Sequence, residues 1–122
     1  MKDEAAIERQ LQDKGLNAPR LTTEHIDSVI VGEYFLKRSP DQPSHPAVDC
    51  LTICVLVLQN GFTVIGESAC ASPENFNAEI GRDIARANAR NKIWQLEGYL
   101  LREKLHQAEQ CRSFAGVDET TF

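Results

Sequence analysis

Three arginines recur at every fourth position in the C-terminal half of this sequence. Arg82, Arg86 and Arg90 share one face if the segment is helical, because residues four apart are neighbours on a helix. A guanidinium group donates two parallel hydrogen bonds to a pair of anionic oxygens, so such a row suits a phosphate or pyrophosphate. Asn88 and Asn91 lie beside the row. The pattern indicates a binding site for an anionic small molecule.

The same arginines have a purely structural alternative. Glu79 and Asp83 stand three or four positions before them, so ion pairs along the helix could use all of the positive charge. Exposed pairs of this kind add little stability, but they are common. Taken alone, the spacing favours this alternative over a ligand site.

A second candidate lies at residues 70–76, where a predicted strand passes into a predicted helix. The first amide groups of a helix have no partner within the helix and favour anions. Phe76 at this junction could stack on a nucleotide base. It could equally anchor the first turn of the helix in the core.

Residues that commonly carry catalysis or bind metals are scattered along the chain. His25, His45 and His106 lie in separate predicted elements, without a nucleophile elbow or a glycine-rich phosphate loop. Cys50 and Cys54 lack a second pair of cysteines or histidines at zinc spacing, so core thiols are favoured over a metal site. We therefore expect no enzymatic activity, no cofactor and no metal.

The composition bounds the class of protein. The chain has 122 residues, the size of one domain, and 13 Lys and Arg against 18 Asp and Glu give a net charge of −5. This charge opposes binding to the phosphates of nucleic acid, and no apolar run approaches the ~18 residues of a membrane span. The first ten residues lack the pattern of a secretory signal. We expect a cytoplasmic protein with free thiols, and neither nucleic acid nor membrane as partner.

The N-terminal part alternates short predicted elements. Residues 3–14 are amphipathic and end at Gly15, which tolerates a positive φ, so they form a helix. Thr22 or Thr23 caps a second short helix, and residues 31–38 are extended. Residues 39–49 contain three prolines and form a loop.

The strongest local pattern is a β-hairpin. Two apolar runs, residues 51–59 and 62–70, flank Asn60-Gly61, a pair typical of a two-residue type I′ turn. That turn pairs Val57 with Val64, Leu56 with Ile65 and Cys54 with Glu67. Both faces of the hairpin are then largely apolar, so we expect both to be covered.

After residue 71 the apolar period changes from that of a strand to that of a helix. Ser72 is expected to cap the helix and Pro73 to occupy its first position. Continued to Gln107, the helix would be ~50 Å long, more than a compact chain of this size spans. It therefore either breaks at Gly81 or Gly98 or packs on another subunit. Its apolar residues form two stripes on opposite sides: Ile80, Ile84, Ala87, Trp94, Leu101 and Leu105 on one, and Ile93, Leu96 and Leu100 on the other.

These elements predict one α+β domain, an antiparallel sheet built around the hairpin and packed on one or more long C-terminal helices, in an oligomer. Its expected parts are an N-terminal helix and linker (1–21), a sheet region (22–70), a helical region (71–110) and a mobile tail (111–122) in which Phe114 or Phe122 could dock.

Residues 51–101 resemble the signature block of the small phage proteins of the Gp forty-nine and protein sixty-six family. The firmest matches are NGFTV, GESAC, SPENF and KIWQLEGYLL. Most members have no assigned activity, so the resemblance implies a phage or prophage origin, and a place in the host cytoplasm, rather than a function.

The order of hairpin, junction and arginine-bearing helix is also similar to the Thoeris anti-defence sponges. Those phage proteins hold cyclic ADP-ribose isomers made by bacterial TIR enzymes, and some hold cyclic oligonucleotides of CBASS systems, without cleaving them. Their ligand lies at a subunit interface against an aromatic residue, an amide and arginines. The resemblance implies these site residues here: Phe76, Arg82, Arg86, Asn88, Arg90 and Arg102.

The leading hypothesis is accordingly a noncatalytic anti-defence protein, a homo-oligomer (dimer or hexamer) that sequesters a nucleotide immune signal. An alternative is a phage accessory protein whose apolar helix faces bind and inhibit a host protein. A third reading is an enzyme that degrades the signal.

Overall fold

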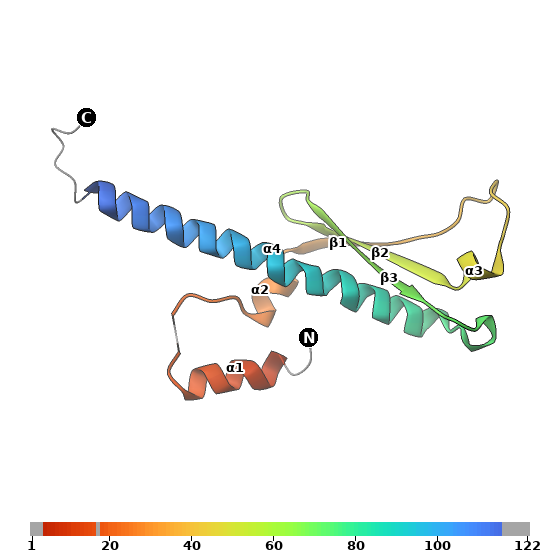
Figure 1. The fold of residues 1–122 in the computed structure, drawn as a ribbon, viewed down its shortest axis with the longest axis horizontal. Coiled ribbons are helices and arrows are strands. Elements are labelled where there is room, and N and C mark those ends of the chain that lie inside the picture. The colour runs from red at the N-terminus through yellow and green to blue at the C-terminus, as the bar shows by residue number, and fades with distance from the viewer. Residues whose placement is uncertain (1–3, 17, 116–122) are drawn as a thin grey trace.

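The computed structural model describes residues 4–16 and 18–115. A three-stranded antiparallel sheet has the order β1-β2-β3, formed by β1 (Ile30–Leu36), β2 (Leu51–Leu58) and β3 (Thr63–Ala69). One long helix, α4 (Ala78–Ala115), lies across one face of this sheet (Figure 1). The predicted α+β architecture is confirmed.

Two short helices precede the sheet and match the sequence prediction closely. α1 (Glu4–Asp13) is followed by Gly15, whose φ is +67°. α2 (Thr23–Ser28) is capped by Thr22, whose hydroxyl accepts a hydrogen bond from the His25 amide. Residue 3, the expected start of the first helix, lies outside the described residues.

The hairpin forms, but its predicted register was wrong by one residue. The Leu58 amide donates to the Phe62 carbonyl at 2.8 Å, so the loop has three residues, 59–61, rather than two. Gly61, the last residue of the loop, has a positive φ of +90°, as expected for a type I turn followed by a left-handed residue. Leu56 therefore pairs with Val64 and Cys54 with Gly66. A shift of one residue exchanges the two faces of a strand.

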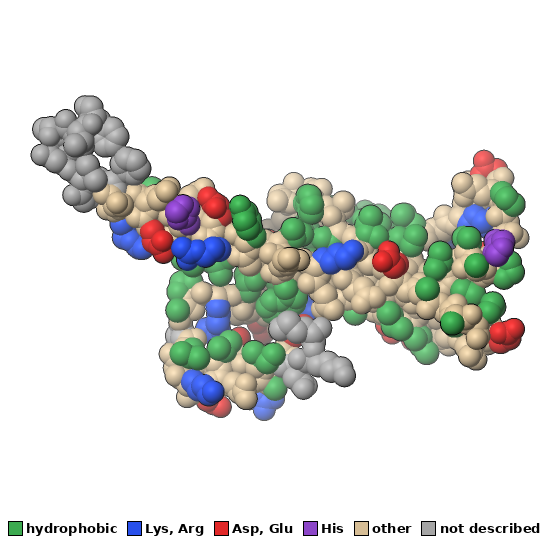
Figure 2. All heavy atoms as spheres, viewed as in Figure 1, with side chains coloured by type: hydrophobic (Ala, Val, Ile, Leu, Met, Phe, Trp, Pro, Cys, Tyr) green, Lys and Arg blue, Asp and Glu red, His purple; other side chains and the backbone are tan. Residues whose placement is uncertain are grey.

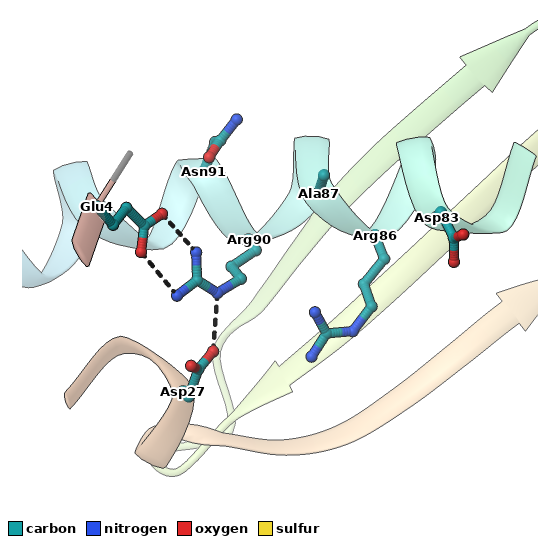
Figure 3. Close-up of a pocket in the computed structure, with 7 residues that line it drawn as sticks. All are labelled: Glu4, Asp27, Asp83, Arg86, Ala87, Arg90 and Asn91. Carbon is teal, nitrogen blue, oxygen red and sulfur yellow. Dashed lines mark hydrogen bonds and ion pairs between the residues drawn. The ribbon is translucent and has the colours of Figure 1, made fainter. Parts of the chain in front are cut away.

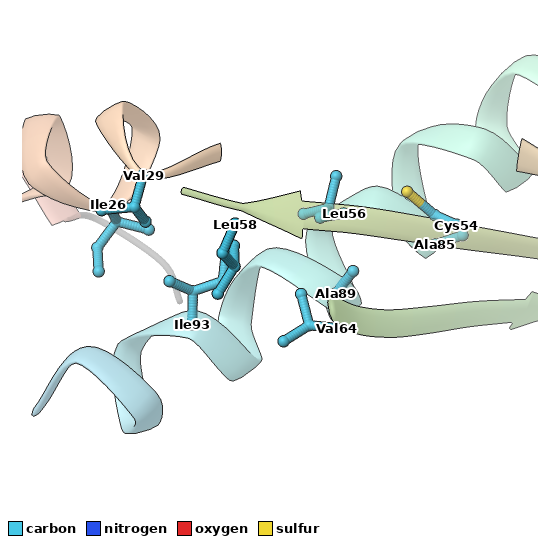
Figure 4. Close-up of a cluster of buried hydrophobic side chains, with 9 residues drawn as sticks. All are labelled: Ile26, Val29, Cys54, Leu56, Leu58, Val64, Ala85, Ala89 and Ile93. Atoms are coloured by element: carbon cyan, nitrogen blue, oxygen red, sulfur yellow. The ribbon is translucent and has the colours of Figure 1, made fainter. Parts of the chain in front are cut away.

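This register decides which side chains form the core (Figure 4). Alternate residues of β2, including Cys54, Leu56 and Leu58, point toward α4 and are buried. The helix meets them with Ala85, Ala89 and Ile93, all fully buried. Ile26 and Val29, from α2 and its C-cap, close one end of the cluster.

Small residues let α4 lie close to the sheet. A Cβ atom at Gly66 would come within 2.8 Å of the Ala89 Cα atom, so the backbones of β3 and α4 are in contact. The helix thus packs through alanines, whereas Ile80 and Ile84, which the sequence placed on one apolar stripe, are exposed at its start. The predicted stripe was wrong for this half of the helix because the sheet selects its smallest face.

The helix begins later and runs further than expected. Residues Pro73–Asn75 form a single 3₁₀ turn, Phe76 is extended, and the Asn77 side chain accepts from the Ile80 amide at 3.0 Å where α4 begins. Ser72 makes no capping bond. α4 then continues unbroken through Gly81 and Gly98 for 38 residues. It includes residues 111–115, which were expected in the tail; residues 116–122 lie outside the described residues, and nothing is shown of the Phe114 side chain.

Two further expectations needed correction. The proline-rich segment contains a one-turn helix, α3 (Pro46–Asp49), whose cap His45 accepts the Ala47 amide on Nδ1 at 3.0 Å. The face of the sheet turned away from α4 is not covered at its centre by any described element, so Tyr34 and Ile65 are exposed there, whereas Leu36 and Ile53 at one end of this face share a cavity with the proline-rich loop and α3. Within the described ranges, no helix is both long and apolar enough to cross a membrane.

Candidate functional site

The predicted arginine row does not form one continuous cationic surface. Arg90 donates to both carboxylate oxygens of Glu4, at 2.8 and 3.1 Å, and to Asp27 at 2.8 Å (Figure 3). The side chains of Arg90 and Glu4 are each only 13% exposed. The hydrogen bonds from Arg90 lower the pKa of Glu4, and those to Glu4 and then Asp27 raise the pKa of Arg90. Arg90 therefore holds the N-terminal helix against α4.

Arg86 is also neutralised, by a carboxylate on the sheet. Its Nε donates to Glu33 of β1, whose side chain points to the α4 side of the sheet. The sequence had offered Glu79 and Asp83, on the same helix, as structural partners. Neither forms an ion pair with these arginines among the described residues; the partners come from α1, α2 and β1 instead.

A hollow of about 540 Å³ lies beside Arg86 and Arg90. Its walls carry three carboxylates and two guanidinium groups, drawn in Figure 3: Glu4, Asp27, Asp83, Arg86 and Arg90. Since both arginines already bind carboxylates, an anion would have to displace an internal ion pair to enter. This hollow is a poor place for a phosphate.

Arg82, the first arginine of the row, lines a different and larger cavity. Its side chain makes no ion pair or hydrogen bond within the described part of the chain. The cavity has a volume of about 830 Å³ and lies between the end of β1, the proline-rich loop, the start of β2 and the start of α4. Phe76 lines the same cavity. The structure thus brings together one aromatic and one cationic residue of the predicted set.

Two more cations line this cavity, Lys37 and Arg38 at the end of β1. Arg38 donates to the Gln42 carbonyl at 2.6 Å, and its Nε lies 3.9 Å from Asp49 of α3. Three basic groups thus face one carboxylate. Lys37 and Arg38 were not predicted as site residues; the signal for them in the sequence is a basic pair directly before the proline-rich loop.

Local backbone structure holds Phe76 at the cavity. The 3₁₀ turn ends with the Phe76 amide donating to the Pro73 carbonyl at 3.1 Å. A Cβ atom at Gly81 would lie 3.7 Å from the ring, which therefore rests on the first turns of α4. The residue is still 37% exposed. Phe76 is thus both packed on the helix and accessible from the cavity.

The remaining predicted site residues lie elsewhere. The Asn88 amide donates to the Glu67 carbonyl of β3 at 2.8 Å, and Lys92 donates to the Ile65 carbonyl of the same strand. Both protect the outer edge of β3. Arg102, on the part of α4 beyond the sheet, pairs with Glu109 at 3.3 Å. Neither Asn88 nor Arg102 lines the cavity that contains Phe76.

The cysteines and acidic residues form no metal site in the described residues. Cys50 and Cys54 are buried, Cys70 is half-buried and Cys111 is exposed, and all four are free thiols. Burial raises the pKa of both Cys50 and Cys54. They pack as apolar side chains rather than as ligands or nucleophiles.

One family model matches residues 21–105, which is more than half of the chain. The chain belongs to the phage protein (N4 Gp49/phage Sf6 gene 66) family. The match runs from just before α2 to well beyond the sheet along α4, so it includes every residue that lines the larger cavity. α1, with Glu4, lies outside it. No curated protein and no solved structure matches the chain.

Proposed function

We propose that this phage-family protein captures a nucleotide-derived immune signal, a cyclic ADP-ribose isomer or a cyclic di- or trinucleotide, and holds it without cleaving it. The site is the cavity lined by Phe76 and Arg82. Such a ligand offers a flat base and an anionic phosphate group. It requires a ring to stack on and cations that are not already paired.

One juxtaposition carries this proposal. An accessible aromatic ring and an unpaired guanidinium lie in the same cavity, whose volume of about 830 Å³ is within the usual range for small-molecule sites. Lys37 and Arg38, which directly follow β1, add positive charge to the lining of the cavity. The arrangement differs from the one implied by the sponge resemblance, because Arg82 alone of the four arginines is included. The expected homo-oligomer and host cytoplasm also belong to this proposal.

Isothermal titration with cyclic ADP-ribose isomers and cyclic dinucleotides tests it. We expect saturable binding by the full chain, and loss of roughly tenfold or more in affinity for Arg82→Ala and for Phe76→Ala. Phe76→Leu keeps the apolar contact with α4 but removes the stacking surface, so it separates binding from packing. Lys104→Ala, an exposed change on the same helix, removes one positive charge as a matched control.

Two results would count against the proposal. One is the absence of heat with every ligand at concentrations well above micromolar. The other is equal loss of affinity in Lys104→Ala and Arg82→Ala, which would indicate attraction by overall charge. Mass analysis of ligand released from denatured protein distinguishes capture from degradation, because an intact ligand shows that no bond was broken.

A second candidate function has one observation in its favour. The exposed face of the sheet carries an apolar residue from each strand at its centre, Tyr34, Val55 and Ile65, as expected for a surface that contacts another protein. An accessory protein that inhibits a host enzyme would use such a surface. A pull-down that recovers a host protein with the wild type, and not with Ile65→Lys, would support this function.

A further inference from the structure

Thr52 of β2 is the one buried polar residue in the part of the chain that the structure describes. It is only 9% exposed, yet its hydroxyl makes no hydrogen bond to any described residue. Burying a hydroxyl without a hydrogen bond costs free energy, so most buried hydroxyls have a partner. Thr52 therefore holds a donor that the described chain itself does not use.

The open space beside Thr52 is the larger cavity, which Thr52 lines together with Phe76 and Arg82. Among the described residues, the fully enclosed side-chain atoms that lack a partner are Arg20 Nε and Trp94 Nε1. Thr52 Oγ1 is not one of them, so this oxygen atom reaches open space. The hydroxyl is thus accessible to a molecule that occupies the cavity.

Gly81 makes room for this hydroxyl beneath the first turns of α4. A Cβ atom at Gly81 would lie 2.7 Å from Thr52 Oγ1 and 3.7 Å from Phe76 Cε1. The hydroxyl and the edge of the aromatic ring therefore border the same point. One flat ring can stack on Phe76 and present its own edge to Thr52. Glycine is unfavourable inside a helix, and the approach of the hydroxyl gives a reason for its presence here.

The other polar groups of the cavity are suited to a different part of a ligand. Lys37, Arg38 and Arg82 are exposed cations, which match phosphate oxygens. Hydrophobic side chains form much of the surface around α3 and the start of α4 (Figure 2). In largely apolar sites a few fixed polar groups set the orientation of the ligand. Of the polar residues that line this cavity, Thr52 alone is buried, and its β-branched side chain has few rotamers.

We propose that Thr52 reads the base of the captured ligand: its hydroxyl donates a hydrogen bond to an acceptor, such as a ring nitrogen of adenine, on the edge of a base stacked on Phe76. This inference rests on the proposed function, because it concerns the same cavity. The charged side chains bind the phosphate groups, and Thr52 adds discrimination. A ligand without the acceptor would leave the hydroxyl unpaired, which lowers its affinity.

Titration of variants of the full chain with adenine-containing ligands, cyclic ADP-ribose isomers and a cyclic dinucleotide with two adenines, tests the inference. Thr52→Val keeps the shape of the side chain and removes the hydroxyl, so we expect affinity to fall about three- to tenfold. Thr52→Ser keeps the hydroxyl and should bind within about twofold of the wild type. The matched control is Ser68→Ala, because Ser68 pairs with Thr52 across the sheet but does not line the cavity. This control should bind as the wild type does.

Two further measurements separate a role in reading the base from other roles of Thr52. Inorganic pyrophosphate has phosphate groups and no base, so it should bind equally to the wild type and to Thr52→Val. The thermal midpoint of the unliganded Thr52→Val variant should be no lower than that of the wild type, since the hydroxyl has no partner in the described chain. A lower midpoint would mean that the hydroxyl is structural, and it would overturn the inference.

Failure of this inference differs from failure of the proposed function. If Arg82→Ala loses affinity and Thr52→Val does not, Thr52 takes no part in recognition, although the cavity still binds the ligand. If the wild type binds none of the ligands, both are overturned. Equal weakening of pyrophosphate and adenine-containing ligands in Thr52→Val also contradicts the inference. If Thr52→Val does not fold, Gly81→Ala replaces it, because the added methyl displaces the hydroxyl; unchanged affinity in Gly81→Ala then overturns the inference.

Discussion

Gly66 of β3 lies directly against Ala89 of α4, so closely that a Cβ atom at position 66 would come within 2.8 Å of the Ala89 Cα atom. Both positions are buried. The contact fixes the distance between sheet and helix, and it thereby sets the position of every side chain that α4 presents to the cavity and to β1.

The first prediction concerns this contact. Gly66→Ala is expected to lower the free energy of unfolding by about 1–3 kcal/mol, because the added methyl meets backbone atoms that cannot move aside. Urea denaturation followed by circular dichroism measures the change.

Gly98→Ala is the matched control for Gly66→Ala. A Cβ atom there meets nothing closer than Leu21 Cδ1 at 3.8 Å, so the substitution should raise stability by about 0.5–1 kcal/mol through helix propensity. If Gly66→Ala were neutral, the close packing of β3 on α4 would be disproved.

Much of the fold was predictable because local signals agreed with the final structure. The N-terminal helix, the Thr22 cap, the extended segment before the prolines and the hairpin all depend on neighbours in sequence. The register of the hairpin was not predictable from Asn60-Gly61, because the same pair serves two-residue and three-residue loops. Which loop forms is decided by the face that α4 covers.

The site was harder to predict because it depends on contacts distant in sequence. Helical spacing correctly placed Arg86 and Arg90 on α4, but their carboxylate partners come from elements more than fifty residues earlier. No local pattern indicates such partners. Phe76 and Arg82 were found by residue type and position, whereas Lys37 and Arg38 reach the cavity only because β1 ends beside α4.

The second prediction concerns the attachment of α1. The pKa of Glu4 lies below its ordinary value of 4.5, chiefly because Arg90 donates to its carboxylate. A carboxyl group with a lowered folded pKa contributes stability above its unfolded pKa and loses it as pH falls through the folded value. We expect the protection of the α1 amides, their exchange rate relative to that of an unfolded chain at the same pH, to fall below about pH 4.5.

Glu4→Gln is expected to give the low protection of the α1 amides already at neutral pH, since the ion pair contributes about 1.5–3 kcal/mol to the docking of α1. Hydrogen exchange by mass spectrometry measures this, with wild type and variant compared at each pH. Asp13→Asn, an exposed change at the end of the same helix, serves as control and should keep the wild-type profile. An identical profile in Glu4→Gln would contradict the role of the Arg90 contact.

The third prediction concerns the four thiols. Cys54 is fully buried and its pKa is raised by burial, so little thiolate forms at pH 8. Cys111, exposed on α4, should be alkylated first, and Cys54 should react only when the core opens. Timed labelling with iodoacetamide and peptide mass analysis measures the order. Cys111→Ser should remove the fastest phase, and rapid labelling of Cys54 would contradict its place in the core.

The last prediction identifies the residue that begins α4. The Asn77 side chain accepts a hydrogen bond from the Ile80 amide, whereas Ser72 makes no capping bond. Asn77→Ala should therefore lower the free energy of unfolding by about 1 kcal/mol, the usual effect of losing an N-cap. Ser72→Ala, at the position where the sequence alone placed the cap, should change it by less than about 0.5 kcal/mol. Because Asn77 directly follows Phe76, Asn77→Ala should also weaken the fixed placement of the ring, and chemical shifts of the Phe76 ring protons would detect this. A larger loss of stability in Ser72→Ala than in Asn77→Ala would mean that the helix begins at Pro73, and that the ring is held by helical rather than extended backbone.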